Sequence, residues 1–184
     1  MKNLILLFST IILITNCAGF KNPNGSGNFN KNNLSEIDGT YKNISSSGTE
    51  TLTEVFDRNT KMFAFLKGGN NKYEEKKDVK LILKIINNKS LNVKIIDSEN
   101  LLFDKNLKIK LKKDGFLYLR KKRFMIEGIP FIAGGWNVQK SCFTIDKNHN
   151  LQVQLNYFFY MAILVVIGDA KTTNSHFTFE KTIN

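Results

Sequence analysis

Short apolar or alternating runs separated by turn residues fill the chain from Glu36 onward, and this pattern restricts the chain to a β-rich fold. The clearest pair is VKLILKII at residues 79–86 and LNVKII at residues 91–96, joined by the turn sequence NNKS. Two strand-like runs joined by about four turn residues predict a β-hairpin. The same reasoning predicts a second hairpin around Asp114-Gly115 and a third around residues 146–150.

The number of these runs predicts an all-β domain over residues 34–184. About eight to ten short strands at hairpin spacing are typical of a sandwich or a barrel, and we expect an antiparallel up-and-down barrel or half-barrel. Residues 51–58 (TLTEVFDR) fit either a strand or a short helical turn, whereas residues 61–66 (KMFAFL) predict a strand. The apolar run at residues 160–167 (YMAILVVI) predicts either a strand that is buried on both faces or a packed core segment.

The amino terminus carries a different pattern. Lys2 precedes an apolar run of about eleven residues, the length of a signal-peptide core and too short for a membrane-spanning helix. The sequence LITNC at residues 13–17 then resembles the lipobox of bacterial lipoproteins, with Asn16 in place of the usual small residue. The resemblance implies that residues 1–16 are a signal peptide that is cleaved, and that Cys17 carries the lipid anchor.

Residues 17–33 are rich in Asn, Gly and Lys and show no hydrophobic period, so we expect a flexible tether behind the lipidated cysteine. The tether contains no acidic residue, because the first one is Glu36. In the lipoprotein family, this absence and Ala18 directly after Cys17 favour the outer membrane, facing the periplasm.

Gly39-Thr40-Tyr41, near the start of the β-domain, resembles the Gly-x-Trp opening of lipocalins, with Tyr in place of Trp. The resemblance implies an eight-stranded barrel whose open end holds a small apolar ligand. The alternative is that Gly39 supplies a turn and Tyr41 is an ordinary core residue.

The formal net charge is +11, and it becomes +10 when residues 1–16 are removed. The lysines are spread along strand-like segments such as KNLKIKLKK at residues 105–113, which does not favour a nucleic-acid partner. They form either a solvated face or a surface attracted to anionic lipid or lipopolysaccharide.

No group of residues predicts catalysis, a metal site or a cofactor. Cys142 has no disulfide partner if Cys17 is acylated, and its alternating surroundings predict a small buried side chain. Neither His149 nor His176 has a second ligand at zinc spacing. The sequence contains no Gly-x-Ser-x-Gly elbow and no phosphate-binding loop. Further polar or aromatic residues considered, and interpreted as structural in the first instance, are Glu74, Glu75, Glu127, Trp136 and Asp169.

These observations predict a non-enzymatic, lipid-anchored protein of the cell envelope that binds an apolar or amphipathic ligand or a protein partner. The alternative is an assembly subunit that docks on an envelope complex, or on anionic lipid, through a basic face. A hydrolase acting on envelope polymers is the third reading, although no ligand-binding or catalytic residue identifies it.

Overall fold

The computed structural model describes Pro23 and residues 25–60, 78–120, 123–129, 133–163 and 167–182. Within this part, the side chains of residues 57–60, 123–137, 162–163 and 167–168 are not described. The predicted signal peptide, Cys17 and the strand expected at residues 61–66 lie outside the described residues.

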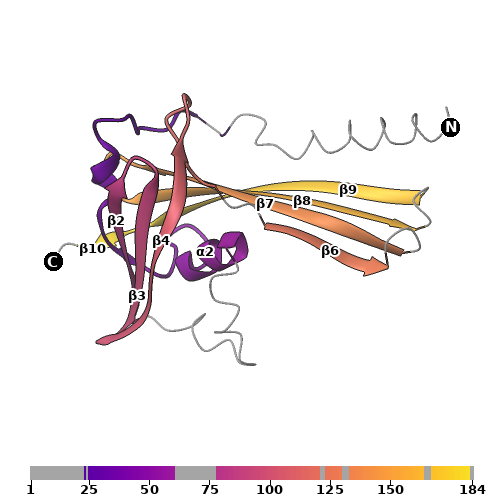
Figure 1. Ribbon diagram of the computed structural model, residues 1–184, viewed down its shortest axis with the longest axis horizontal. Helices are drawn as coiled ribbons and strands as arrows, with labels where there is room; N and C mark the ends of the chain where they lie inside the picture. Colours follow the sequence, from indigo (N-terminus) through magenta and orange to yellow (C-terminus); the bar gives the residue numbers. More distant parts are fainter. Residues whose placement is uncertain are drawn as a thin grey trace.

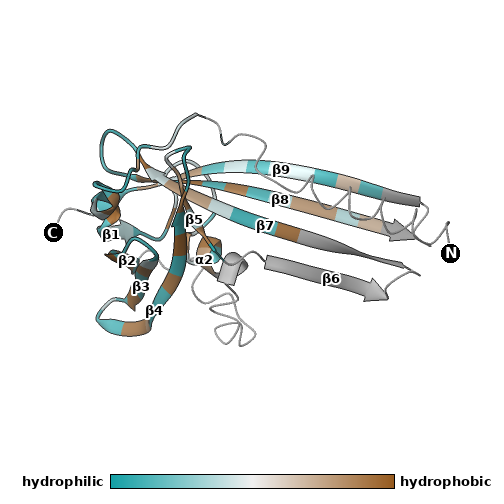
Figure 2. Cartoon of the chain, turned by 45° about the horizontal axis from the view of Figure 1, so that its top comes forward, coloured by the Kyte–Doolittle hydropathy of each residue, from teal (hydrophilic) through white to brown (hydrophobic). Residues whose placement is uncertain are grey.

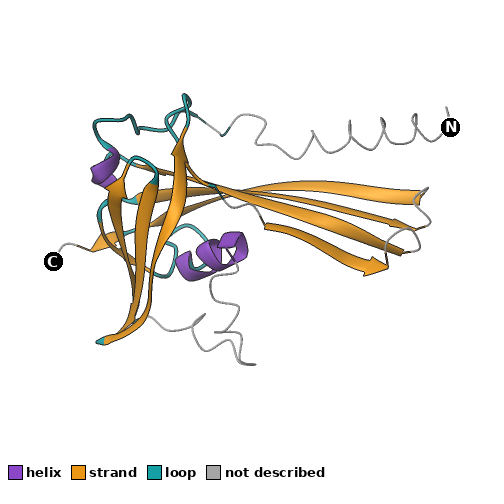
Figure 3. Cartoon of the chain, viewed as in Figure 1, coloured by secondary structure: helices purple, strands orange, loops and turns teal. Residues whose placement is uncertain are grey.

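The described chain forms one antiparallel sheet with two short helices, so the all-β prediction is confirmed (Figures 1 and 3). The strands follow the order β10-β1-β2-β3-β4-β5-β7-β8-β9, and β6 pairs with β7 outside this path. The elements are η1 Leu34–Ile37, β1 Gly39–Lys42, α2 Leu52–Thr60, β2 Val79–Asn87, β3 Ser90–Asp97, β4 Asn100–Leu111, β5 Leu117–Leu119, β6 Arg123–Ile129, β7 Ala133–Ile145, β8 Leu151–Ile163, β9 Ile167–Phe179 and β10 Lys181–Thr182.

The sheet is an antiparallel meander that does not close into a barrel, so the closed-barrel form of the prediction is wrong. A barrel needs continuous pairing between neighbouring strands around its circumference. Here β5 has only three residues, and it alone connects β4 to β7. β7, β8 and β9 pair with one another over thirteen residues each, and beyond this short junction they run away from the other strands (Figure 1).

The sheet therefore has two regions. We call the "ribbon" the part formed by β6 and by the ends of β7, β8 and β9 that extend beyond the paired residues Ser141, Leu155 and Ser175. The remaining strands, together with η1 and α2, form the "body". The run at residues 160–167 is not one strand: residues 160–163 continue β8, Ile167 begins β9, and residues 164–166 lie outside the described residues. Met161 is 49% exposed, which contradicts burial on both faces at that position.

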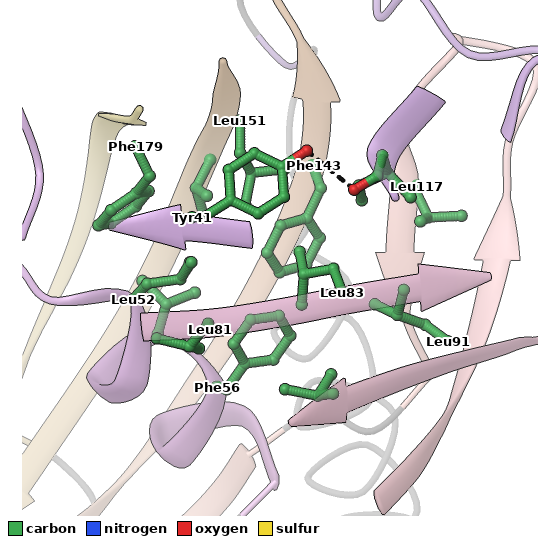
Figure 4. Close-up of a cluster of buried hydrophobic side chains, with 14 of the residues drawn as sticks. Tyr41, Leu52, Phe56, Leu81, Leu83, Leu91, Leu117, Phe143, Leu151 and Phe179 are labelled. Atoms are coloured by element: carbon green, nitrogen blue, oxygen red, sulfur yellow. Dashed lines mark hydrogen bonds between the residues drawn. The ribbon is translucent and has the colours of Figure 1, made fainter. Parts of the chain in front are cut away.

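The core lies in the body, between the concave face of the sheet and α2. Alternate residues of β2 and β3 point into it, including Leu81, Leu83 and Leu91 (Figure 4). Phe56 of α2 stacks on Phe143 of β7 with ring centroids 5.4 Å apart. The concave face that a lipocalin-like ligand would occupy is thus packed with the protein's own side chains.

Tyr41, the aromatic residue of the Gly-x-Trp-like sequence, is fully buried in this core. Its hydroxyl donates a hydrogen bond of 2.8 Å to the carbonyl oxygen of Ile37 in η1, drawn as the dashed line in Figure 4. Burial raises the pKa of Tyr41 well above its usual value, and Asp38 adds to the shift. Tyr41 thus fixes the short 3₁₀ turn against β1, as a core residue would.

Residues 51–58, for which the sequence left two possibilities, form the beginning of α2. The backbone N–H of Thr51 donates to a Glu54 carboxylate oxygen at 3.0 Å, and the backbone N–H of Glu54 donates to the Thr51 hydroxyl at 3.3 Å. This reciprocal arrangement is a capping box, which satisfies backbone donors at a helix start.

Gly27, Asn28 and Phe29 pack on the body, although their composition predicts a flexible tether. Phe29 belongs to the main hydrophobic core and is 4% exposed. Asn28 donates from its backbone N–H to the Thr144 hydroxyl at 2.8 Å and from its side chain to the Ile145 carbonyl oxygen at 2.7 Å. One buried aromatic ring and backbone pairing thus order a segment whose composition favours disorder.

Among the helices that the structure describes, neither is long and apolar enough to cross a membrane.

Candidate interaction surface

The convex face of β2, β3 and β4 carries most of the exposed charge of the body. Strand alternation places Leu81 and Leu83 in the core and Lys80 and Lys84 in solvent. Figure 2 shows the resulting alternation of hydrophilic and hydrophobic residues along β4. The lysines expected to form a solvated face do so because every second residue of these strands is required for the core.

In the middle of this face the lysines are paired with carboxylates. Lys94 lies 3.1 Å from a carboxylate oxygen of Asp104, and the Asn92 side chain donates to the other oxygen at 2.7 Å. The hydrogen bond from Asn92, followed by that from Lys94, lowers the pKa of Asp104. Lys42 forms a further ion pair with Glu180. These lysines are locally neutralised.

One end of the same face is different. Exposed basic side chains gather where the β2–β3 turn, the end of β4 and the residue after β5 meet. The backbone N–H of Ile109 donates to the Lys89 carbonyl oxygen, and that of Arg120 donates to the Lys108 carbonyl oxygen, both at 2.9 Å. We call this group the "basic end"; its members are Lys84, Lys89, Lys108, Lys110, Lys112, Lys113 and Arg120.

No carboxylate of the described residues lies within salt-bridge distance of these seven side chains. Two carboxylates of the same end are already engaged. Asp38 accepts a hydrogen bond of 2.7 Å from the backbone N–H of Ile85. Asp114 accepts one of 2.7 Å from the Tyr118 hydroxyl and one of 3.0 Å from the backbone N–H of Phe116.

Three further acidic residues lie at the opposite end of the strands. Asp78 precedes β2, and Asp97 and Glu99 flank the β3–β4 turn. Antiparallel pairing places Asp97 beside Val79 and Ser90 beside Lys108, so the two turns lie at opposite ends. The convex face is therefore electrically polarised along its strands.

A small second core lies beneath the basic end and consists of Phe116, Tyr118 and Cys142. The Lys112 ammonium lies 3.7 Å above the Tyr118 ring, within cation–π distance. Burial and the hydrogen bond to Asp114 raise the pKa of Tyr118 far above its usual value. This packing holds the turn that presents Lys112 and Lys113.

Cys142 is fully buried, which confirms the prediction of a small packed side chain. Burial, followed by the charge of Asp114, raises the pKa of its thiol to about 12. Because the thiolate is the reactive form, this thiol is inert at neutral pH.

The N-terminal segment joins the body at the basic end. The backbone N–H of Gly27 donates to the Asp114 carbonyl oxygen at 2.8 Å, and that of Phe29 donates to the Gly115 carbonyl oxygen at 3.0 Å. A Cβ atom on Gly27 would lie 2.1 Å from the Gly115 oxygen, so the two backbones cross where only glycine fits. Figure 1 shows the segment and the turn after β4 at the same end of the molecule.

The other residues considered from the sequence are not brought together. His149 lies in the β7–β8 turn with a φ of 60°, and His176 lies in β9. Asp169 is exposed in β9 opposite Met161. Glu127 lies in β6 and Trp136 in β7, with side chains that are not described, whereas Glu74, Glu75 and Cys17 lie outside the described residues. The described residues contain no group of three or more metal-ligating side chains.

Sequence reasoning found the lysines but missed their gathering at one end, because they belong to segments that only the strand register joins. It also missed Gly27, whose role depends on the approach of Gly115. A comparison of the chain with protein-family models, curated proteins and solved structures found no match.

Proposed function

We propose that this protein is a non-enzymatic lipoprotein of the cell envelope, anchored through Cys17, whose basic end rests on the anionic headgroups of the membrane. One observation carries the proposal: the N-terminal segment joins the body beside Lys112 and Lys113. The chain that would lead to the lipid thus starts from the same end of the molecule as the unpaired positive charge.

The anchor would be short. Only nine residues lie between Cys17 and Gly27, which is bound to the body, so ten Cα–Cα steps join them. A fully extended chain of this length spans at most about 35 Å. The basic end would therefore stay close to the surface, where the potential of anionic lipids decays within roughly 10 Å.

The two attractions would act together. Acyl chains supply the affinity, and each basic residue near an anionic surface adds about 1 kcal/mol. The basic charge would then set which face of the body meets the membrane, while the acidic residues at the far end point away from it. Binding of an apolar ligand, the other predicted function, has less support because α2 and Phe143 fill the concave face.

Vesicle binding tests the electrostatic part. Residues 17–184 with Cys17→Ala are mixed with phosphatidylcholine vesicles that contain either no or one-third phosphatidylglycerol. We expect binding to the anionic vesicles only, weakening with salt. Lys108→Glu with Lys110→Glu should reduce it by about 30-fold or more, as expected from the loss of about 2 kcal/mol.

The matched control is Lys42→Glu with Lys80→Glu, which changes the net charge equally at two exposed sites that face each other across β1 and β2, at the end opposite the basic end. Equal losses in the two double variants would contradict a localised surface. Fatty-acid labelling of the full chain tests the anchor separately, because equal incorporation in wild type and Cys17→Ala would exclude lipidation at Cys17.

A further inference from the structure

The long edge of β9 is a second surface, in the ribbon and apart from the basic end. On one side β9 pairs with β8 over thirteen residues without a register shift. On the other side, the described partners lie only at its end, where the Thr178 carbonyl oxygen accepts from the backbone N–H of Ser46 at 2.9 Å. Between Ile167 and Ser175, no described residue forms a backbone pairing with this outer edge.

The side chains along this edge are also uncovered. All six residues from Asp169 to Asn174 are exposed. Natural edge strands are usually short, interrupted by bulges or proline, or protected by several charges. β9 is long and regular, contains no proline, and carries only Asp169 and Lys171 in its exposed half. Its free backbone groups thus form a template for another strand.

We propose that the β9 edge pairs with β9 of a second copy of this chain, antiparallel and centred on Ala170. Asp169 and Lys171 are two residues apart and share a face of the sheet. Pairing about a two-fold axis at Ala170 places each Asp169 opposite Lys171 of the other copy. Opposite charges directly across an antiparallel pair are stabilising, and the small Ala170 side chains face each other at the axis.

Two-fold axes at neighbouring residues of β9 do not place opposite charges across from each other. Pairing centred on Asp169 or on Lys171 places like charges directly opposite each other, which is destabilising. Centres at Thr172 or Thr173 leave both charged residues opposite neutral ones. The charge pattern therefore selects one register for self-association.

The shape of the molecule permits this pairing. The axis at Ala170 lies nine residues from Phe179, where β9 reaches the body, and this corresponds to about 30 Å along the strand. The two bodies would lie at opposite ends of the joined ribbons. Figure 1 shows β9 along one margin of the ribbon, which projects away from the body.

Disulfide trapping tests the register in the full chain, expressed in bacterial membranes. Ala170→Cys should give a covalent dimer under mild oxidation, because residues facing each other across the axis have Cα atoms about 4.5–5.5 Å apart. Thr172→Cys is the matched control: it is equally exposed, but its two copies would lie about 13 Å apart. The unsubstituted chain reports any cross-link through Cys17.

Charge exchange tests the pairing without cysteines. In the purified full chain, Asp169→Lys or Lys171→Asp alone should lower the dimer affinity by about tenfold, as expected from two unfavourable pairs per dimer. The double exchange should restore it, as measured by sedimentation. A monomer at all concentrations, equal cross-linking at residues 170 and 172, or a larger ring without the Ala170→Cys cross-link would overturn the proposal.

Discussion

The body and the ribbon are built from the same sheet but are stabilised differently. In the body, one face of β2 and β3 is buried in the hydrophobic core, and the other face carries exposed or half-buried residues such as Lys80, Lys84 and Lys94. In the ribbon, residues 169–174 of β9 are all exposed, and Tyr157 and Met161 of β8 are 36% and 49% exposed. Among the described side chains, apolar burial is concentrated in the body, and Phe158 is the one buried apolar residue of the ribbon. The described part of the ribbon is held mainly by its backbone ladders.

The ribbon nevertheless has polar contacts of its own. The Asn156 side chain, which is 2% exposed, donates to the Asn174 side-chain oxygen at 2.6 Å across β8 and β9. A buried amide is costly unless it is hydrogen-bonded, so this pair favours one strand register. Such contacts specify pairing but supply little of the stability that apolar burial supplies in the body.

The largest effect should come from removing an aromatic ring from the body. Phe143→Ala removes the stacking partner of Phe56 and should lower the free energy of unfolding by about 3–5 kcal/mol. Met161→Ala in the ribbon should change it by less than about 0.5 kcal/mol, because Met161 is half exposed. Denaturant unfolding measures both, and similar losses would erase the proposed difference between the regions.

Gly27→Ala should have an intermediate effect. The added Cβ would lie 2.1 Å from the Gly115 oxygen, so the N-terminal segment must move away from the turn, at a cost of about 1–3 kcal/mol. Ser26→Ala, at the preceding exposed position, is the control. Thermal unfolding measures the loss of stability, and faster hydrogen exchange at the Phe29 amide should accompany this loss. Unchanged exchange would show that the segment is not held by this contact.

The smallest effect concerns pH and the core beneath the basic end. The pKa of Cys142 is raised from 9.0 to about 12, so the folded state favours the neutral thiol. Its stabilising contribution is complete below pH 9 and is lost as the pH rises from 9 toward 12. We expect a loss on the order of 1 kcal/mol between pH 8 and pH 10.

Cys142→Ala should have a lower free energy of unfolding than the wild type at pH 8. Its free energy of unfolding should, however, fall less than that of the wild type between pH 8 and pH 10. Urea unfolding at the two pH values measures the difference. An identical loss in wild type and variant would assign the alkaline sensitivity to other groups. The exposed ribbon carries no such buried thiol among its described side chains.

The sequence predicted the body better than the ribbon, for a physical reason. The β2–β3 hairpin was found because burial on one face imposes alternation on residues 79–96. The first half of β9, with the sequence IGDAKTTNS, has no such alternation because backbone pairing with β8 holds it. The helix α2 could have been assigned from the capping-box spacing of Thr51 and Glu54.

Barrel closure could not be predicted, because it depends on the length of β5 rather than on hydrophobic pattern. Beyond the three residues of β5, β4 has no described strand partner on that side, and β7 pairs with β6 instead of with β4. The candidate surface was predictable only as an excess of lysine. Its position depends on which lysines lie opposite a carboxylate, and this is decided by the strand register. The register places Lys94 opposite Asp104 but Lys108 opposite Ser90.

The crossing of Gly27 and Gly115 also defines how tension would travel through the protein. A pull on the amino-terminal chain meets first the two backbone hydrogen bonds of Gly27 and Phe29, and then the buried Phe29 ring. The load passes into the turn after β4 and, through the hydrogen bonds of Asn28, into the end of β7. Under tension, we expect the N-terminal segment to detach from the turn first. The chain between the anchor and the body would then lengthen before the strands of the body separate.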